Sequence, residues 1–419
     1  MHTFSPELLI PAGDMERFRT AVLYGADAVY LGGSAGNLRA GSKGLDAAEL
    51  REAVAFANAH GVKLYYCLNA LPFERDMRTV PQAVESAADS GVHAFIVADP
   101  GVMSLAQRYA PRVPIHISTQ ANTTNAAAVR FWTEAGASRV VLARELPHRE
   151  IRAIRTQLPE TELEVFVHGA MCLAVSGQCL LSAWLNNRPA NLGRCTQPCR
   201  FEYRVAETDF PPSFTLEEAL RPDELLWSVQ QDEKFTALFA PDDLCLLPFL
   251  PWFVKHGISA LKIEGRTKGV AYVAHVTDVY RAALDAAKAS VATGEPFAFH
   301  EFLPDLVRTS SRRPLSTGFF LTRRQILSRD AAPRPLLAKI LEPVDTAKNA
   351  WAVMVLGTWD GDQAVEFMLP GMRRPVMQPG TYALENHRGE RAGSVATGTR
   401  AVLFAETPGI RPGVFVRAL

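Results

Sequence analysis

Four cysteines are crowded into one short stretch of this chain. Cys172, Cys179, Cys195 and Cys199 lie in the segment 168–200, HGAMCLAVSGQCLLSAWLNNRPANLGRCTQPCR, and only two other cysteines occur elsewhere. Thiolates are preferred ligands of soft metal ions and also carry redox chemistry. The crowding therefore indicates a metal centre or a redox site.

The spacing of these cysteines distinguishes between kinds of metal centre. Six, fifteen and three residues separate successive members of the set. A structural zinc site usually starts from a cysteine pair about two to four residues apart, and only Cys195 and Cys199 fit that spacing. An iron–sulfur cluster has a larger core and tolerates wider ligand separations. The spacing favours an iron–sulfur cluster and leaves a zinc site, or buried or redox-active thiols, as alternatives.

The other two cysteines stand among apolar residues. Cys67, in KLYYCLN, is predicted to be a small core residue of a strand. Cys245, in PDDLCLL, has the same interpretation, but it is also a candidate fourth ligand of the metal site in place of Cys199.

The elements that must position these residues alternate between β-rich apolar runs and amphipathic helical stretches. One such helical stretch, 45–61, has apolar residues at helical spacing and ends at a glycine. Eight strand–helix units predict an α/β fold, a (β/α)8 TIM-like barrel, in preference to a doubly wound open sheet. The predicted strands are 7–12, 28–33, 63–69, 94–100, 114–122, 139–145, 163–169 and 259–265.

The rest of the chain completes a two-domain organisation. The barrel domain is predicted over 1–292, with the cysteine-rich insertion 168–200 in the long connection between its seventh and eighth strands. A Pro- and Arg-rich linker, 293–335, follows. Short strands separated by Gly, Pro, Asp and Asn turns predict a small, closed, β-barrel-like domain over 336–419.

Polar residues gather at the carboxyl ends of the predicted barrel strands, where barrels of this kind hold their active sites. The arginines and the lysine would form a cationic rim for carboxylate or phosphate groups. The candidate substrate-binding residues are Asn69, Asp99, Gln120, Asn122, Arg144, Arg266 and Lys268. The candidate proton-transfer residues are Glu145, His168 and Glu264. Lys262 and Glu264 share one strand face, so we expect at least one of them to be paired or near solvent.

Composition gives weak information on partners. The 44 basic and 44 acidic residues balance, although a basic patch can hide in a neutral total. No apolar run long enough for a membrane span occurs, and the N-terminus lacks the pattern of a secretory signal. We therefore predict a cytoplasmic protein without a membrane span. Clustered cysteines in that reducing compartment are more often metal or redox ligands than disulfides.

Several segments of the chain resemble the collagenase-like peptidase family. They are PELLIPAGDMERFRTAVLYGADAVYLGG, HGAMCLAVSGQCLLS, NLGRCTQPCR and ALKIEGRTKGVAYVAHVTDVYR. Within that family the chain is most similar to bacterial tRNA uridine hydroxylation proteins, and the segment PIHISTQAN and the β-rich C-terminus support this subgroup.

The resemblance implies a cofactor and a reaction. It implies a [4Fe–4S] cluster on Cys172, Cys179, Cys195 and Cys199, with Cys245 as the alternate ligand because some relatives lack a counterpart of Cys199. It further implies oxygen-independent hydroxylation of the wobble uridine of tRNA (position 34) to 5-hydroxyuridine, with prephenate as the co-substrate.

We therefore predict a tRNA-modifying hydroxylase whose partners are tRNA and an electron donor or cluster-assembly protein. A peptidase is the first alternative, since the family carries that name, although the sequence has no recognisable nucleophile–base pair. A non-catalytic iron–sulfur scaffold that works with a partner protein is the second. The sequence does not predict the oligomeric state.

Overall fold

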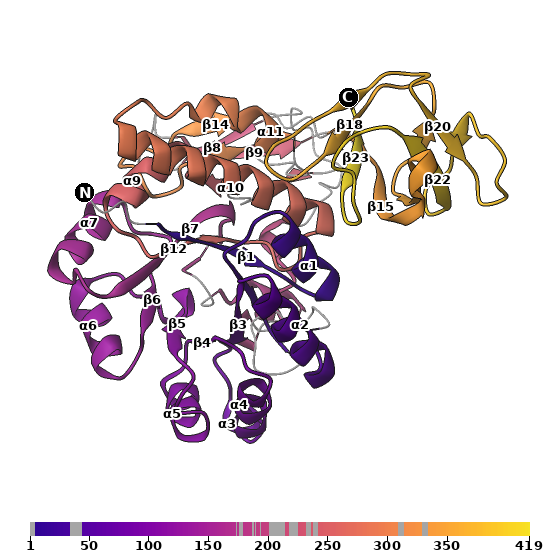
Figure 1. Ribbon diagram of the computed structural model, residues 1–419. Coiled ribbons are helices and arrows are strands. Elements are labelled where there is room, and N and C mark those ends of the chain that lie inside the picture. Colours follow the sequence, from indigo (N-terminus) through magenta and orange to yellow (C-terminus); the bar gives the residue numbers. More distant parts are fainter. Residues whose placement is uncertain are drawn as a thin grey trace.

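A closed barrel of eight parallel strands forms most of the N-terminal two-thirds of the computed structural model (Figure 1). The structure describes residues 5–33, 44–172, 174–175, 179–186, 188, 190–192, 194–200, 214–217, 225–231, 236–237, 242–308, 314–328 and 334–419. The last barrel strand pairs in parallel with both the first and the seventh, which closes the ring. The eight strands confirm the predicted barrel: β1 (Glu7–Pro11), β2 (Ala28–Leu31), β3 (Lys63–Leu68), β4 (Ala94–Val97), β5 (Ile115–Ile117), β6 (Arg139–Val141), β7 (Glu162–Ala170) and β12 (Ala260–Ile263).

Helices between the strands cover the outside of the barrel (Figure 1). Their ends follow local sequence signals: Asp46 and Glu49 form a capping box at the start of α2, and Asp99 caps α5 through the amide of Val102. None of the helices in the described residues is long and apolar enough to cross a membrane. The covering helices are α1 (Met15–Leu23), α2 (Ala47–Ala59), α3 (Glu74–Met77), α4 (Val80–Asp89), α5 (Pro100–Tyr109), α6 (Ala126–Glu134), α7 (His148–Gln157), α9 (Leu250–Lys255) and α10 (Val270–Thr293).

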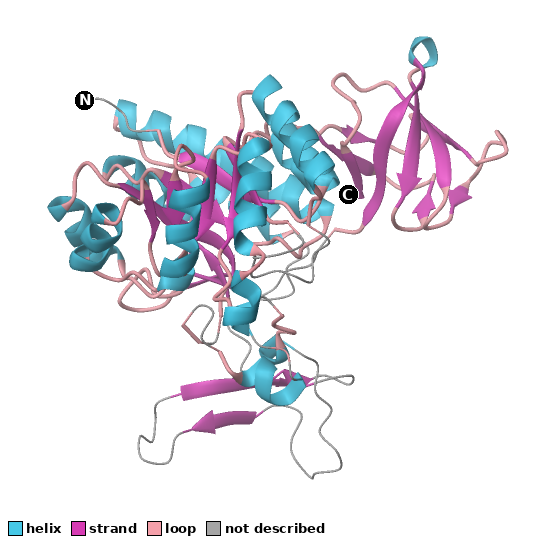
Figure 2. Cartoon of the chain, turned by 90° about the horizontal axis from the view of Figure 1, so that it is seen from below, coloured by secondary structure: helices cyan, strands magenta, loops and turns pink. Residues whose placement is uncertain are grey.

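The connection from β7 to β12 carries the cysteine segment and a group of short strands. Figure 2 shows β8 and β9 standing away from the barrel at one end of the molecule. Another strand, β11, runs antiparallel to the carboxyl end of β7 and so extends the barrel sheet. The elements are α8 (Leu181–Asn186), η2 (Ala190–Leu192), η3 (Pro198–Arg200), β8 (Phe214–Glu217), β9 (Leu225–Gln231), β10 (Thr236–Ala237), β11 (Asp243–Cys245) and η4 (Leu247–Phe249).

The segment 293–335 is more than the linker that its composition suggested. It contains η5 (Phe299–Glu301), α11 (Leu303–Val307), β13 (Leu315–Ser316) and β14 (Ile326–Ser328). Strand β13 pairs with β11, and β14 pairs with β13, so this segment continues the sheet that starts at β7. Buried Leu306 and Phe320 join the barrel core.

A β-bulge interrupts β7 near its carboxyl end. Lys262 lies beside Phe166, but the next residue of β12, Ile263, lies beside His168, so Val167 is an extra residue in β7. One inserted residue reverses which face the following side chains point to. Gly169 follows with a φ of +108°, a conformation that favours glycine.

The C-terminal residues form a separate antiparallel domain, as predicted. Its two end strands, β19 and β20, do not pair with each other within residues 334–419, so backbone hydrogen bonds do not close the predicted barrel. The seven-stranded sheet comprises β15 (Leu336–Asp345), β16 (Ala350–Val355), β18 (Val365–Met368), β19 (Val376–Met377), β20 (Tyr382–Glu385), β22 (Arg400–Ala405) and β23 (Phe415–Ala418). A short 3-10 turn, η6 (Thr346–Lys348), and a two-stranded sheet of β17 (Trp359–Asp360) and β21 (Ser394–Val395) complete the domain.

Buried charges join the C-terminal domain to the barrel. The domain lies beside α1 and α10 (Figure 1). Arg374 pairs with Asp278 of α10 at 2.7 Å and with Asp305 of α11 at 2.8 Å. Arg417 of β23 also pairs with Asp305, and it lies 2.5 Å from Glu366. A buried charge is costly unless a partner of opposite charge lies beside it. These ion pairs therefore favour one arrangement of the C-terminal domain on the barrel.

Acid is expected to weaken this interface through His275, which lies 3.2 Å from Asp305. Burial lowers the pKa of His275, although Asp305 opposes the shift. A histidine whose pKa is lower in the folded state contributes stability above its ordinary pKa of about 6.5 and loses it as the pH falls below that value. The melting temperature of the full chain should therefore fall less between about pH 7 and pH 5 in His275→Gln than in the wild type.

The matched control for this experiment is His300→Gln, since His300 is exposed. It should retain the wild-type dependence of melting temperature on pH. An identical pH dependence for His275→Gln and the wild type would contradict the prediction.

Candidate functional site

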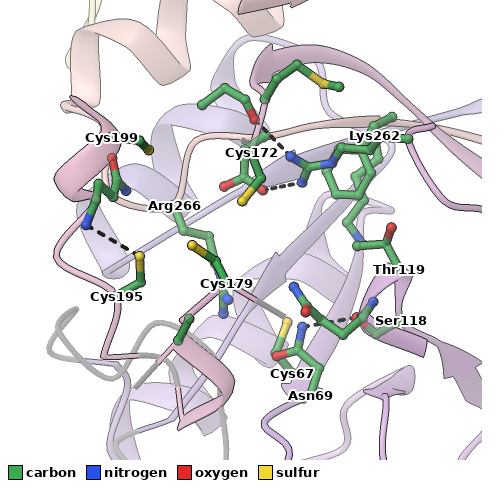
Figure 3. A pocket seen from close by; sticks show the side chains of 18 of the residues that line it. Cys67, Asn69, Ser118, Thr119, Cys172, Cys179, Cys195, Cys199, Lys262 and Arg266 are labelled. Atoms are coloured by element: carbon green, nitrogen blue, oxygen red, sulfur yellow. Dashed lines mark hydrogen bonds and ion pairs between the residues drawn. The ribbon is translucent and has the colours of Figure 1, made fainter. Parts of the chain in front are cut away.

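A cavity opens at the carboxyl ends of the barrel strands, beneath the cysteine segment. Its lining comes from five barrel strands, β2, β3, β4, β7 and β12, from the loops that follow β3, β5, β6 and β12, and from the connection after β7. Figure 3 shows the four cysteines of the segment on one side and Asn69, Ser118 and Thr119 on the other. The cavity therefore has walls of different chemistry.

The thiol wall contains all four cysteines predicted as metal ligands: Cys172, Cys179, Cys195 and Cys199. Cys172 is exposed and the other three are half-buried. The amide of Gln197, a residue with a φ of +60°, donates a hydrogen bond of 3.4 Å to the Cys195 sulfur. No three His, Cys, Asp or Glu side chains of the described residues converge as ligands of one metal ion. The thiols instead surround a common space.

The two remaining cysteines occupy different places. Cys245 is fully buried in the barrel core, where its sulfur lies 3.7 Å from the Tyr280 hydroxyl, and burial raises its pKa to about 11. It does not line the cavity. Cys67 packs inside the barrel, as predicted, but it also borders the cavity, and burial raises the pKa of its thiol.

Arg144 lines the cavity and is held by several contacts. It donates to the Ala170 carbonyl at 2.8 Å and to the Glu264 carboxylate at 2.9 Å. Its guanidinium also lies 3.9 Å from the centre of the Phe166 ring, a cation–π contact. The other Glu264 oxygen accepts from the Gly265 amide at 3.1 Å. These contacts orient both charged side chains toward the same part of the lining.

Two further cations line the cavity. Arg266 is 5% exposed and lies over the Tyr30 ring. Lys262 was not among the predicted binding residues, yet its ammonium lies 4.4 Å from the centre of that ring and donates to Glu164 at 2.7 Å. Lys262 and Glu264 are thus both paired. This satisfies the expectation that at least one of them would be paired or near solvent. A buried lysine in a strand gives no sequence signal of its function, because its partner is distant in the chain.

A network of charges continues from Lys262 through the barrel interior. Glu164 lies 3.4 Å from Arg139, and Arg139 lies 2.7 Å from Glu7 at the start of β1. Glu7 also accepts from the Tyr65 hydroxyl at 2.9 Å. Each buried charge has a partner of opposite sign, which offsets the cost of its desolvation.

The third wall is neutral and polar. The Asn69 amide donates to the Ser118 hydroxyl oxygen at 3.2 Å, and Thr119 donates to the Leu142 carbonyl at 3.3 Å. Gln120 belongs to the same lining. Asn69 and Gln120 were predicted, whereas Ser118 and Thr119 were missed, because hydroxyl residues after a strand are common and carry little signal on their own.

Besides His168, four of the predicted substrate-binding and proton-transfer residues lie outside the cavity lining. Asp99 is used as the helix cap of α5, and the Lys268 ammonium lies over the Tyr272 ring. Asn122 has a φ of +51° and donates to the Gln120 carbonyl at 3.1 Å, so it shapes the turn beside the cavity. Glu145 also does not line the cavity, although it follows β6 closely.

His168 is the clearest correction to the predicted site. The bulge at Val167 places its ring on the outer face of β7, between Tyr272 and Tyr280 of α10, and its Nδ1 lies 3.3 Å from the Tyr280 hydroxyl. It is 2% exposed, and burial lowers its pKa to about 4. His168 is therefore a neutral core residue near pH 7, and its predicted role in proton transfer is wrong.

Comparisons with known proteins identify the family of this chain. A model of peptidase family U32 matches residues 13–330. The chain is 38% identical over 322 residues to "tRNA hydroxylation protein P" of Escherichia coli, which covers 70% of each protein. It is 39% identical over 319 residues to "tRNA hydroxylation protein P1" of Bacillus subtilis, which covers 76% of this chain and 71% of that protein.

A third relative has a different printed name. The chain is 32% identical over 327 residues to "23S rRNA 5-hydroxycytidine C2501 synthase" of Escherichia coli, which covers 76% of this chain and 46% of that protein. The family model spans β2 to β12 of the barrel and the cysteine segment. The chain therefore belongs to peptidase family U32.

Proposed function

We propose that this protein is an RNA-modifying hydroxylase that converts the wobble uridine of tRNA to 5-hydroxyuridine, with prephenate as co-substrate. The observation that supports it most is one cavity that combines four cysteines with cations and neutral polar groups. The relatives named as tRNA hydroxylation proteins supply the substrate class. Replacing the C5 hydrogen of uridine by a hydroxyl group adds one oxygen atom and removes two electrons. The step balances when the co-substrate gives up that oxygen atom and takes the two electrons, so that its C–OH becomes C–H.

The thiol wall is suited to a [4Fe–4S] cluster. Cys172, Cys179, Cys195 and Cys199 would hold it, and Cys245 is too deeply buried in the core to replace any of them. The hydrogen bond from the Gln197 amide to the Cys195 sulfur is of the kind that tunes such clusters. When bound, the cluster would supply electron transfer beside the substrate.

The three cations of the lining, Arg144, Arg266 and Lys262, would bind the carboxylates of the co-substrate. Arg144 and Arg266 have guanidinium groups that match carboxylates in shape, and Lys262 adds a third positive charge at the same lining. Glu264 is the remaining candidate for proton transfer, because it is the one of the three predicted groups that lines the cavity. Arg144 holds it in place at 2.9 Å.

The lining does not favour a peptidase. Ser118 is its candidate nucleophile, but the Ser118 hydroxyl is bonded to the Asn69 amide, and no histidine is among the described residues of the lining. A serine nucleophile needs an adjacent base to accept its proton. Peptidase activity and a scaffold role remain as distinguishable outcomes of the experiment.

Anaerobic purification with iron and sulfide analysis, followed by an assay of tRNA, tests the proposal. We expect broad absorption near about 400 nm and roughly four iron and four sulfide per chain. Expression in a strain lacking its own tRNA hydroxylation proteins should restore 5-hydroxyuridine. Zinc without sulfide would contradict the cluster. A cluster without restored hydroxylation would favour the scaffold, and cleavage of a casein substrate by metal-free protein would favour the peptidase.

A further inference from the structure

We propose that Ser118 and Gln120 read the hydrogen-bonding edge of the substrate base, and this inference rests on the proposed function. Both residues line the cavity as part of the neutral wall. Figure 3 shows Ser118 on the side opposite the four cysteines of the segment 168–200. An enzyme that modifies a base takes it out of its stack and recognises its edge by hydrogen bonds in a pocket. The neutral wall is the part of this cavity whose chemistry fits that task.

Ser118 has a hydroxyl proton left to donate. Its oxygen accepts from the Asn69 amide at 3.2 Å and from the Gln120 backbone amide at 3.3 Å. A hydroxyl oxygen has two lone pairs and one proton, so these two bonds use its capacity as an acceptor. No group in the described part of the chain accepts the proton. Ser118 is 2% exposed, so the cavity is where a partner would be found.

Gln120 has an acceptor that lacks a donor. Its side-chain oxygen is buried and accepts no hydrogen bond from the described residues. An unsatisfied buried acceptor is unfavourable by about 1–3 kcal/mol, which an N–H of a ligand would relieve. The turn that carries it is fixed at both ends, by Ser118 as its cap and by Asn122, which donates to the Gln120 carbonyl.

These two groups match uracil in polarity. Uracil presents a carbonyl acceptor at C4 beside an N–H donor at N3, so a hydroxyl donor and an amide acceptor are complementary to it. Cytosine has a donor at the first position and an acceptor at the second, which reverses both. Ser118 and Gln120 carry no charge, whereas carboxylates of a co-substrate would select Arg144, Arg266 and Lys262 elsewhere in the lining.

The test measures dissociation constants for an anticodon stem-loop RNA with uridine or cytidine at the target position, using anaerobically purified protein. The wild type should bind the uridine RNA more tightly. Ser118→Ala and Gln120→Met should each weaken binding of the uridine RNA about tenfold, with little change for the cytidine RNA. The preference for uridine should therefore largely disappear, while binding through phosphates persists.

Matched substitutions outside the cavity are the controls. Ser138→Ala removes a hydroxyl that donates to the Ile115 carbonyl, and Gln107→Met removes an amide that donates to the Ala135 carbonyl. Both should retain the wild-type preference. If the wild type restores 5-hydroxyuridine in cells but Ser118→Ala and Gln120→Met keep the uridine preference, this inference fails alone. If the wild type restores no 5-hydroxyuridine, the proposed function fails.

Discussion

Cys179→Ala is expected to abolish the visible absorption of the anaerobically purified protein and its tRNA hydroxylation. Cys179 is one of the four cysteines of the segment 168–200 that line the cavity. A [4Fe–4S] cluster that loses a cysteine ligand is usually lost or degraded. The measurement is an absorption spectrum with iron and sulfide analysis, together with the 5-hydroxyuridine content of tRNA from cells that express the variant. A wild-type spectrum would remove Cys179 from the ligand set.

A matched pair of variants decides the fourth ligand. Cys199→Ala should behave like Cys179→Ala, because Cys199 lines the cavity. Cys245→Ala should keep the spectrum, because Cys245 is buried beside Tyr280 in the core. The opposite result for this pair would assign the fourth position to Cys245.

Arg417→Met is expected to lower the free energy of unfolding by about 3 kcal/mol, because it removes a buried cation from Asp305 and Glu366. Asp305 would keep Arg374 at 2.8 Å and Glu366 would keep Arg334 at 3.3 Å, so neither carboxylate would lose every partner. The Arg417 guanidinium is 1% exposed and contacts Asp305 of the barrel and Glu366 of the C-terminal domain. Methionine nearly preserves its volume, so the lost charge accounts for the effect. Thermal and denaturant unfolding of the full chain measure the change.

The control for this substitution is Arg400→Met, on an exposed position of β22. It should change the free energy of unfolding by less than about 0.5 kcal/mol. Equal stability of Arg417→Met and the wild type would show that the interface charges contribute nothing net to stability.

The barrel could be predicted because its signals are local. Each strand is a short apolar run, and helix caps such as Asp46 mark where the covering helices begin. The four cavity cysteines could be predicted for the same reason, since they lie in one loop. The segment 293–335 was underestimated, because β13 and β14 are only two and three residues long. Strand β13 depends on pairing with β11, and β14 depends on pairing with β13.

The direction in which the side chains of the site point could not be predicted from the sequence. His168 was predicted to face the site because it stands at the carboxyl end of a predicted strand. The bulge that turns it away arises from the pairing of β7 with β12, which the sequence does not indicate. Asp99 stands at a strand end, yet the start of α5 uses it as a cap. Lys262 became a site residue only through contacts with Tyr30 and Glu164, which are remote in the chain.

The charge network inside the barrel limits how this site can be altered or transplanted. Lys262 at the cavity is linked through Glu164 and Arg139 to Glu7, so its ammonium is held from the opposite end of the barrel. Among homologues we expect these four positions to vary together rather than singly. A designer who grafts the cavity onto another scaffold would have to transfer Glu164, Arg139 and Glu7 inside the barrel along with the loops that line the cavity.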